Sequence, residues 1–208
     1  METLREIAIR CGTDKVQFGY TDIYEKYLEP RRKDILRVLE IGTYNGASLR
    51  MWRDYFQKAE VYGLDINPDT LFEDKRIRTL QFDQGASGAE YARMLNIIAE
   101  KNDFDIIIDD GSHFQQHIMQ SFTYLFGALK PGGYYFIEDV ANEQISLRQG
   151  HTWGSEKPDF SDAVIKIFEE KKKKKLERRI ESIDIYYAQK PPLTQAGTSD
   201  VIVVKKAL

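Results

Sequence analysis

The feature that most constrains the fold is an apolar run that enters a glycine turn and is followed by a second apolar run ending in an acid. The first run covers residues 37–41 and leads to Gly42 and Gly46, and the second covers residues 61–64 and ends in Asp65. A strand, a glycine turn, a helix and a second strand in this order form one half of a doubly wound sheet. An acid at the end of the second strand can accept hydrogen bonds from ribose hydroxyls. The segment therefore predicts an α/β domain that binds a nucleoside.

Beyond this segment, apolar strands continue to alternate with amphipathic helices. Such alternation implies parallel strands joined by right-handed crossovers, and two closely joined β-rich runs near the end of the chain are expected to pair antiparallel. We therefore expect an α/β fold, with a Rossmann-like, doubly wound and mostly parallel seven-stranded sheet and a C-terminal antiparallel hairpin. The strands are expected near residues 36–41, 60–65, 76–82, 104–109 and 132–138, the helices near 46–57, 87–101 and 113–129, and the hairpin strands at 183–187 and 201–204.

Length and composition fit one domain. A chain of 208 residues with 42% apolar content can bury a full core. We expect a single domain over residues 1–208, in which residues 1–34 form a helical cap over one sheet edge and residues 35–208 form the Rossmann-like core. Further along, the pattern loosens, and residues 149–155 are a candidate substrate loop before a helix expected at about 159–179.

Charge and cysteine usage exclude several classes of partner. The formal net charge is −3, so no global basic field attracts nucleic acid or an anionic membrane. The lysine run 171–175 follows Glu169 and Glu170, and we interpret it as a solvated helix surface with paired charges. The only cysteine, Cys11, cannot form an intramolecular disulfide, the N-terminus is too charged for a signal peptide, and no apolar run approaches the roughly 20 residues that span a bilayer. We expect a cytoplasmic protein with no nucleic-acid or membrane partner.

The spacing of the glycine turn discriminates between cofactors. Tyr44 stands where a dinucleotide-binding turn has its middle glycine, and a pyrophosphate needs that glycine for close approach. Gly42 and Gly46 still let the backbone approach a ligand, and the N-terminus of the following helix offers N–H donors. The missing middle glycine favours S-adenosylmethionine over NAD. Asp83 and Gln84, at the end of the third strand, are positioned to hydrogen-bond the edge of an adenine ring. A strand-to-helix turn without a ligand, and strand-end acids that are only exposed charges, are the alternatives.

Further acids follow the fourth and fifth strands. Asp110 comes directly after Asp109 at the end of the fourth strand, and Glu138 and Asp139 end the fifth. The carboxyl ends of neighbouring parallel strands meet at the sheet edge where α/β folds place their chemistry. Converging carboxylates repel one another unless a cation neutralises them, and hard oxygen ligands suit Mg²⁺. We therefore expect Asp110, Glu138 and Asp139 to hold a magnesium ion.

Together these motifs resemble a class I S-adenosylmethionine-dependent methyltransferase. More narrowly, they resemble the metal-dependent sugar O-methyltransferases of macrolide and related natural-product pathways, a group often placed together with cephalosporin hydroxylases. The resemblance implies methyl transfer to a hydroxyl of a small, sugar-containing acceptor, and it spans roughly residues 11–140. It is carried by residues 12–15 with Tyr20 and Tyr24, and by residues 39–42, 47–52, 62–66, 83–84 and 108–113.

The resemblance also implies roles for individual residues. Catechol-type methyltransferases share this layout, with a base three residues after the first metal-binding acid, and the offset from Asp110 falls on His113. An imidazole titrates near neutral pH and can remove a hydroxyl proton, so the resemblance implies that His113 is the general base. The alternative is that His113 is a structural residue at the start of a helix, hydrogen-bonded locally. We expect His117 to pack in the core or to support the site residues. Ser48 is implied as a cofactor contact, and the alternative is that it only packs its helix. The implied cofactor contacts are Thr13, Lys15, Glu40, Gly42, Gly46, Ser48, Asp65, Asp83, Gln84 and Asp109.

Two other functions stay open beside sugar O-methylation. A catechol-type O-methyltransferase would bind a vicinal aromatic diol, and Trp153, Tyr134 and Tyr135 suit an aromatic ring as well as a sugar or a core. A non-catalytic S-adenosylmethionine-binding domain is disfavoured, because a scaffold has no reason to concentrate uncompensated carboxylates. Neither the identity of the acceptor nor assembly into a homo-oligomer follows from the sequence.

Overall fold

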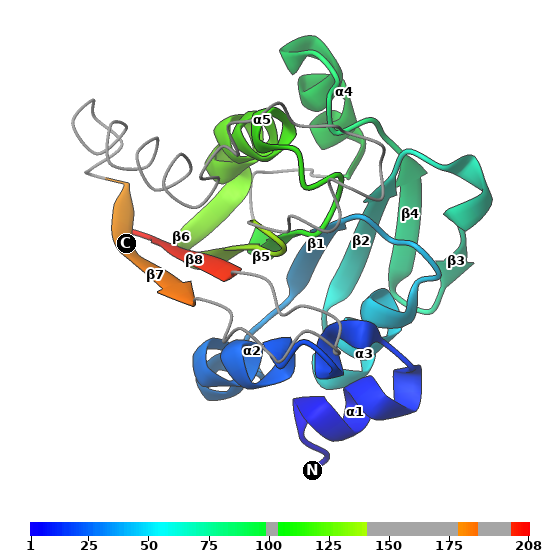
Figure 1. Ribbon diagram of the computed structural model, residues 1–208, viewed down its shortest axis with the longest axis vertical. Helices are drawn as coiled ribbons and strands as arrows, with labels where there is room; N and C mark the ends of the chain where they lie inside the picture. Colours follow the sequence, from blue (N-terminus) through cyan, green and yellow to red (C-terminus); the bar gives the residue numbers. More distant parts are fainter. Residues whose placement is uncertain (99–103, 141–178, 187–200) are drawn as a thin grey trace, which may run out of the picture.

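The computed structural model describes residues 1–98, 104–140, 179–186 and 201–208. Within these residues one twisted sheet forms the centre of the molecule (Figure 1). Its strands are β1 (Arg37–Ile41), β2 (Glu60–Asp65), β3 (Glu73–Asp74), β4 (Ile77–Gln81), β5 (Phe104–Asp109), β6 (Leu129–Ile137), β7 (Ile180–Tyr186) and β8 (Val201–Lys206). They lie in the order β3-β4-β2-β1-β5-β6-β8-β7. The strands from β4 to β6 in this order are parallel, whereas β3, β8 and β7 each pair antiparallel with their inner neighbour.

The predicted α/β fold is confirmed: the sheet is doubly wound and mostly parallel, and β7 and β8 form the C-terminal antiparallel pair. All seven predicted strands are present. The eighth, β3, is a pair of exposed acids and is too short to leave a periodic signal. Strand β6 begins at Leu129, earlier than expected, because Leu129 already pairs with Phe104 of β5, and the register then shifts before Tyr134 pairs with Ile106.

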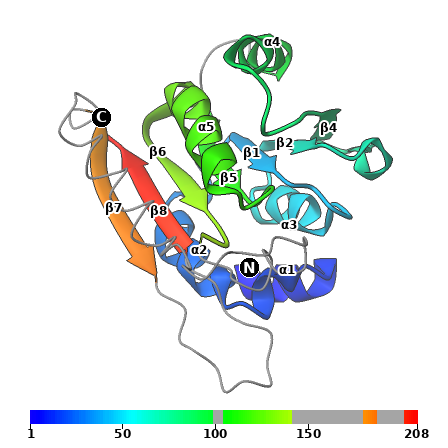
Figure 2. The same ribbon diagram turned by 45° about the horizontal axis from the view of Figure 1, so that its top comes forward.

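Helices cover both faces of the sheet (Figures 1 and 2). One apolar cluster joins the sheet to α1, α2 and α3, and a second joins the opposite face to α4 and α5. The α-helices of the described residues are α1 (Leu4–Cys11), α2 (Tyr20–Leu28), α3 (Ala47–Tyr55), α4 (Gly88–Ile98) and α5 (Gln115–Leu125). The helix expected to reach residue 129 ends at Leu125 and continues only as a short 3₁₀ turn, Phe126–Ala128. No helix of the described residues is both long and apolar enough to cross a bilayer.

The central strands are buried on both faces, as parallel strands between two helical layers must be. On β5, Ile106 and Ile108 pack toward α1–α3, whereas Ile107 packs toward α4 and α5. On β1, Val38 and Leu39 divide in the same way. This alternation follows from the two-residue period of a strand. Because β1, β2, β5 and β6 are parallel, their carboxyl ends meet at the same end of the sheet.

The N-terminal helices lie across a face of the sheet beside α3, rather than over one sheet edge (Figure 2). Their apolar stripes, which include Leu4 and Tyr24, are fully buried in the same cluster as Val38. The segment is therefore part of the core. Three expected features, the loop at 149–155, the helix at 159–179 and the lysine run within it, lie outside the described residues.

Candidate active site

Gly42 joins the end of β1 to the loop after β5. Its backbone is left-handed, with φ of +88°, and a Cβ on it would overlap the backbone carbonyl of Asp110. Gly46 is likewise left-handed, with φ of +74°, and a Cβ there would overlap the ring of Phe72. Only glycine combines this backbone with such close approach. The glycine turn thus packs directly against the loop that carries the acids, with the N-terminus of α3 beside it.

Asp65, at the end of β2, shapes the glycine turn. Its Oδ2 accepts hydrogen bonds from the backbone N–H groups of Thr43 at 2.8 Å and Tyr44 at 3.1 Å, and its Oδ1 accepts from Asn67 at 2.9 Å. Partial burial opposes ionisation of this carboxyl, but the N–H donors outweigh it and hold the pKa of Asp65 below its ordinary value. The carboxylate is therefore charged and fixed beside the turn, where the sequence expects a ribose contact.

Two of the expected cofactor contacts belong to an internal network. Gln84 donates to Asp109 Oδ1 at 2.7 Å and to Ser121 at 3.1 Å, and its Oε1 accepts from the backbone of Ser112 at 2.9 Å. Gln84 and Asp109 are both buried, and burial raises the pKa of Asp109 to about 6. Asp83 stays exposed, with its Oδ1 accepting from the backbone of Gly85. The structure therefore uses Gln84 and Asp109 to brace the loop after β5 and leaves Asp83 available to a ligand.

Lys15 supplies a buried positive charge to the acids. Its Nζ lies 2.6 Å from Asp110 Oδ2, 2.8 Å from Glu138 Oε1 and 3.5 Å from Glu40 Oε1, and the residue is only 1% exposed. Burial opposes this charge, but the surrounding carboxylates outweigh it and raise the pKa of Lys15 well above its usual range. Expected as a cofactor contact, Lys15 is in this structure an internal counter-ion.

Three other expected cofactor contacts surround Lys15 and the start of α3. Thr13 caps the short 3₁₀ turn Asp14–Val16 that carries Lys15. Glu40 is fully buried and accepts from Trp52 Nε1 at 2.6 Å, and burial raises its pKa. Ser48 lies almost buried in the first turn of α3. These side chains hold the base of the site together.

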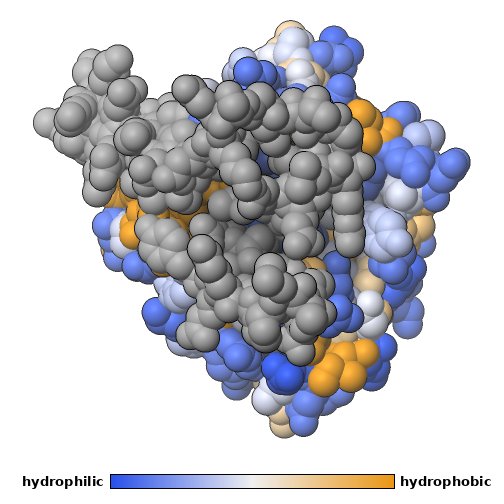
Figure 3. Space-filling model, viewed as in Figure 1, coloured by the Kyte–Doolittle hydropathy of each residue, from blue (hydrophilic) through white to orange (hydrophobic). Residues whose placement is uncertain are grey.

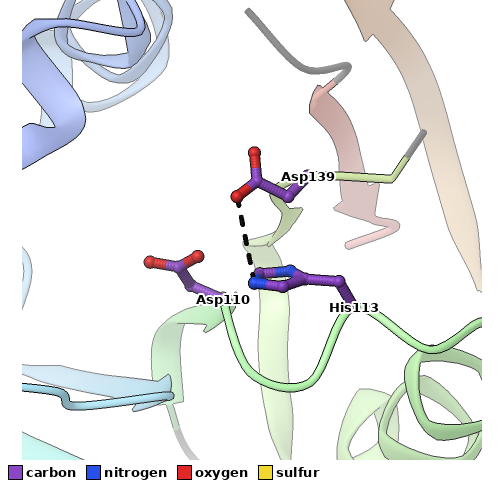
Figure 4. A group of neighbouring side chains, drawn as sticks. All are labelled: Asp110, His113 and Asp139. Carbon is purple, nitrogen blue, oxygen red and sulfur yellow. Dashed lines mark ion pairs between the residues drawn. The ribbon is translucent and has the colours of Figure 1, made fainter. Parts of the chain in front are cut away.

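Asp110, His113 and Asp139 form a compact cluster at the ends of β5 and β6 (Figure 4). Each offers one potential ligand atom, and these atoms all lie within 4.8 Å of one another. His113 Nε2 is 3.8 Å from Asp139 Oδ2. Two carboxylates and an imidazole at this spacing suit a divalent cation. Among the described residues, these three side chains are placed closely enough to bind one metal ion together.

Glu138, the third expected metal ligand, is engaged next to this cluster. Both of its oxygens accept from Lys15 Nζ, at 2.8 and 2.9 Å, and its Oε1 also accepts from the hydroxyl of Tyr24. Burial and the charge of Asp110 raise the pKa of Glu138 well above its usual range. Three carboxylates, those of Glu40, Asp110 and Glu138, thus contact one lysine, and the carboxylate of Asp139 lies beside Asp110. This excess of negative charge fits an additional cation.

The backbone is strained at the same place. His113 has φ of 58° and Asp139 has φ of 55°, in the left-handed region that non-glycine residues rarely adopt. Such strain costs about 1–3 kcal/mol per residue and gathers at functional sites, where the surrounding structure holds it. Both residues therefore occupy positions that regular strand and helix geometry would not provide.

Helix α5 begins at Gln115, later than the expected start at residue 113, so His113 lies in the loop before it and His117 in its first turn. The Nδ1 of His117 is 2.8 Å from the hydroxyl of Ser112, and its ring packs edge-on against Phe114. Two residues that sequence reasoning left without a role also reach the acids: the hydroxyls of Tyr20 and Tyr24 on α2 donate to Asp139 and Glu138. In the sequence both tyrosines are only among the residues that carry the family resemblance.

Most of the chain matches the model of one protein family. A family model described as "Methyltransferase domain" matches residues 32–189, about three quarters of the chain. The chain belongs to the methyltransferase-domain family. The family resemblance seen in the sequence is thereby confirmed.

Two similar proteins are O-methyltransferases by name. The mycinamicin VI 2''-O-methyltransferase of Micromonospora griseorubida is 40% identical over 147 residues, which is 66% of this chain and 36% of that protein. The 8-demethyl-8-alpha-L-rhamnosyl tetracenomycin-C 2'-O-methyltransferase of Streptomyces olivaceus is 36% identical over 155 residues, 71% of this chain and 40% of that protein. The chain thus spans well under half the length of these curated relatives.

A solved structure supports the same relationship. The MycE methyltransferase from the mycinamycin biosynthetic pathway, in complex with Mg and SAH, matches 99% of this chain and 55% of its own chain. The TM-score is 0.77 and the sequence identity 30%. Another structure of MycE, with a TM-score of 0.75, also contains mycinamycin VI.

Proposed function

We propose that this chain is an S-adenosylmethionine-dependent O-methyltransferase that requires Mg²⁺ and methylates a hydroxyl of a sugar or glycosylated natural product. The observation that carries the proposal is the contact between the glycine turn and the acidic cluster. Because Gly42 packs against the backbone of Asp110, a ligand on the turn and a cation at the acids would be direct neighbours. Methyl transfer needs this proximity of donor and acceptor.

The cofactor would lie against Gly42, Gly46 and the N-terminus of α3. The charged Asp65 is fixed beside this turn and suits the ribose hydroxyls, and the exposed Asp83 suits the adenine edge. The departure from a dinucleotide turn at Tyr44 removes the glycine that a pyrophosphate needs. These residues bind and orient the donor, and they take no part in proton transfer.

Asp110, Glu138 and Asp139 would hold Mg²⁺, which when bound would polarise the acceptor hydroxyl. Ligation by Glu138 would require it to exchange part of its interaction with Lys15 for the ion. His113 is the group to receive the hydroxyl proton, at Nε2, the nitrogen that faces Asp139. Asp139 then stabilises the imidazolium that forms. The methyl group leaves the sulfonium as the acceptor oxygen attacks, and Nε2 holds the released proton.

The acceptor class rests on the relatives. Proteins that match about two thirds of this chain are named as O-methyltransferases of mycinamicin VI and of a rhamnosyl tetracenomycin. We therefore propose a small, sugar-containing acceptor and no nucleic acid. We also propose that residues 1–208 act as one domain in the cytoplasm, because the N-terminal helices share the core and the chain has a single cysteine. Of the aromatic residues that could suit a catechol ring, Tyr135 is fully buried, Tyr134 is half-buried and Trp153 lies outside the described residues.

The test is a methyl-transfer screen over glycosides with neighbouring hydroxyls, read by mass spectrometry. Purified protein is incubated with S-adenosylmethionine and each glycoside, with Mg²⁺ or with EDTA. The proposal expects a mass gain of one methyl group only with Mg²⁺. Transfer to simple catechols but to no glycoside would instead support the catechol-type alternative.

A further inference from the structure

Two tyrosines of α2 meet the two consecutive acids that follow β6. The hydroxyl of Tyr20 donates to Asp139 Oδ1 at 2.5 Å, and that of Tyr24 donates to Glu138. Positions four residues apart lie on the same face of a helix, one turn from each other. Two hydrogen bonds thus connect helix α2 to the segment after β6, and each is accepted by a carboxylate of the site.

The contact with Tyr20 divides the two oxygens of Asp139 between two tasks. Oδ1 accepts from the tyrosine hydroxyl, whereas Oδ2 lies 3.8 Å from His113 Nε2, within the cluster (Figure 4). A partial rotation of the carboxylate would move both oxygens out of these positions and take Oδ2 away from His113. A donor fixed on Oδ1 opposes that rotation. It also keeps Oδ2 on the side of His113 and Asp110.

Tyr20 is itself held in place. The residue is 2% exposed, and its ring stacks on Phe18 with centroids 5.6 Å apart. A buried phenol hydroxyl needs a hydrogen-bond partner, because an unmet one costs about 1–3 kcal/mol. Asp139 has a left-handed backbone that the strand does not enforce. The rigid partner is therefore the tyrosine, and the carboxylate is the group that it orients.

We propose that Tyr20 is a positioning residue, which holds one oxygen of Asp139 so that the other faces the metal and the base. The inference rests on the proposed function, because it assigns Asp139 to the magnesium site. Hydrogen-bond partners of metal ligands typically account for about 10–100-fold in metal affinity or activity. Loss of the Tyr20 hydroxyl should therefore weaken Mg²⁺ binding to that extent while the glycine turn, which is held by the carboxylate of Asp65, keeps its shape.

The test measures Mg²⁺ binding by isothermal titration calorimetry, with S-adenosylhomocysteine present, for the wild type and for Tyr20→Phe. Tyr27→Phe is the matched control: it lies on the same helix and loses hydrogen bonds to Asp184 and Tyr186 instead. We expect the Kd for Mg²⁺ to rise about tenfold or more in Tyr20→Phe and to stay within twofold in Tyr27→Phe. Affinity for S-adenosylhomocysteine should stay within twofold in both variants, whereas a general loss of structure would lower it.

A double-mutant cycle links the effect to the named oxygen. In an Asp139→Asn background, Tyr20→Phe should weaken Mg²⁺ binding by less than twofold further, because the oriented carboxylate is already gone. Equal effects of Tyr20→Phe in both backgrounds, or a wild-type Kd in Tyr20→Phe, would overturn the positioning role and leave the proposed function standing. A wild-type protein that binds no Mg²⁺ would overturn both together.

Discussion

The ammonium of Lys15 lies 2.6 Å from the carboxylate of Asp110, although 95 residues separate them in sequence. The same nitrogen contacts Glu138, which is 123 residues away. A short turn near the N-terminus thus carries the positive charge that keeps the acids of β5 and β6 together. The N-terminal segment is accordingly part of the site.

Replacing Lys15 by Met should strongly destabilise the metal-free protein. Removing one partner of a buried ion pair costs about 3–5 kcal/mol, because the remaining charge is left uncompensated. Burial and the charge of Asp110 raise the pKa of Glu138, and in Lys15→Met no lysine opposes this effect. Glu138 of the variant therefore takes up a proton as pH falls, which removes the uncompensated charge. The loss of stability relative to the wild type should be smaller at pH 5 than at pH 8. Urea unfolding in EDTA at both pH values measures it.

Lys130→Met is the control for this substitution. Lys130 pairs with Asp105 at 3.1 Å but is more exposed, so its loss should cost much less than that of Lys15. A Lys15→Met protein as stable as the wild type at pH 8 would show that the ion pairs around Asp110 are not needed to hold the acids.

Asp109 should make the metal-free protein more stable in acid. Burial raises the pKa of Asp109 from 3.8 to about 6, so the folded state binds a proton more tightly than the unfolded state. Its contribution is fully present below about pH 4 and is lost as pH rises through 6, a change of about 3 kcal/mol. Asp109→Asn, in which Ser121 and Gln84 can still bond the side chain, should flatten this part of the profile. Urea unfolding between pH 4 and pH 7.5 in EDTA is the measurement, and an unchanged slope would argue against a buried, titrating Asp109.

His113→Ala should separate proton transfer from binding. A general base contributes about 100-fold to 10,000-fold, so turnover should fall by that range while the affinity for S-adenosylhomocysteine stays within twofold. His117→Ala should cost far less, because its ring contacts Ser112 and Phe114 rather than the acids. Small and equal losses of turnover in the two variants would assign the proton to another group. A large loss of Mg²⁺ affinity in His113→Ala would instead make the imidazole a ligand.

The fold could be predicted closely, because its signals are local. Strands with two-residue periods, amphipathic helices and the turn at Gly42 specify a doubly wound sheet, and the sheet brings strand ends together. The juxtaposition of Asp110 and Asp139 followed from that rule alone. The two-residue strand β3 and the early start of β6 could not be predicted, since neither leaves a periodic pattern.

The finer structure of the site depends on long-range contacts that no local pattern encodes. Lys15 and Tyr20 reach the acids across more than ninety residues, and each has an ordinary place in its own short helix. Gln84 and Asp109 have the chemistry of ligand contacts, yet burial and mutual hydrogen bonds direct them inward. Residue type and strand-end position locate an active site, but which of its polar groups face the ligand is decided by tertiary packing.

The most direct measurement of the central claim is methyl transfer to a glycoside with neighbouring hydroxyls, in Mg²⁺ and in EDTA, for the wild type and for Asp110→Asn and Asp139→Asn. The wild type should transfer one methyl group in Mg²⁺, lose transfer in EDTA and regain it when Mg²⁺ is restored. Both variants should stay folded and bind S-adenosylhomocysteine, yet lose at least about 100-fold in turnover, because the acids that hold the ion are neutralised. Full activity in EDTA, or wild-type turnover in both variants, would contradict the proposal that these carboxylates form a catalytic metal site.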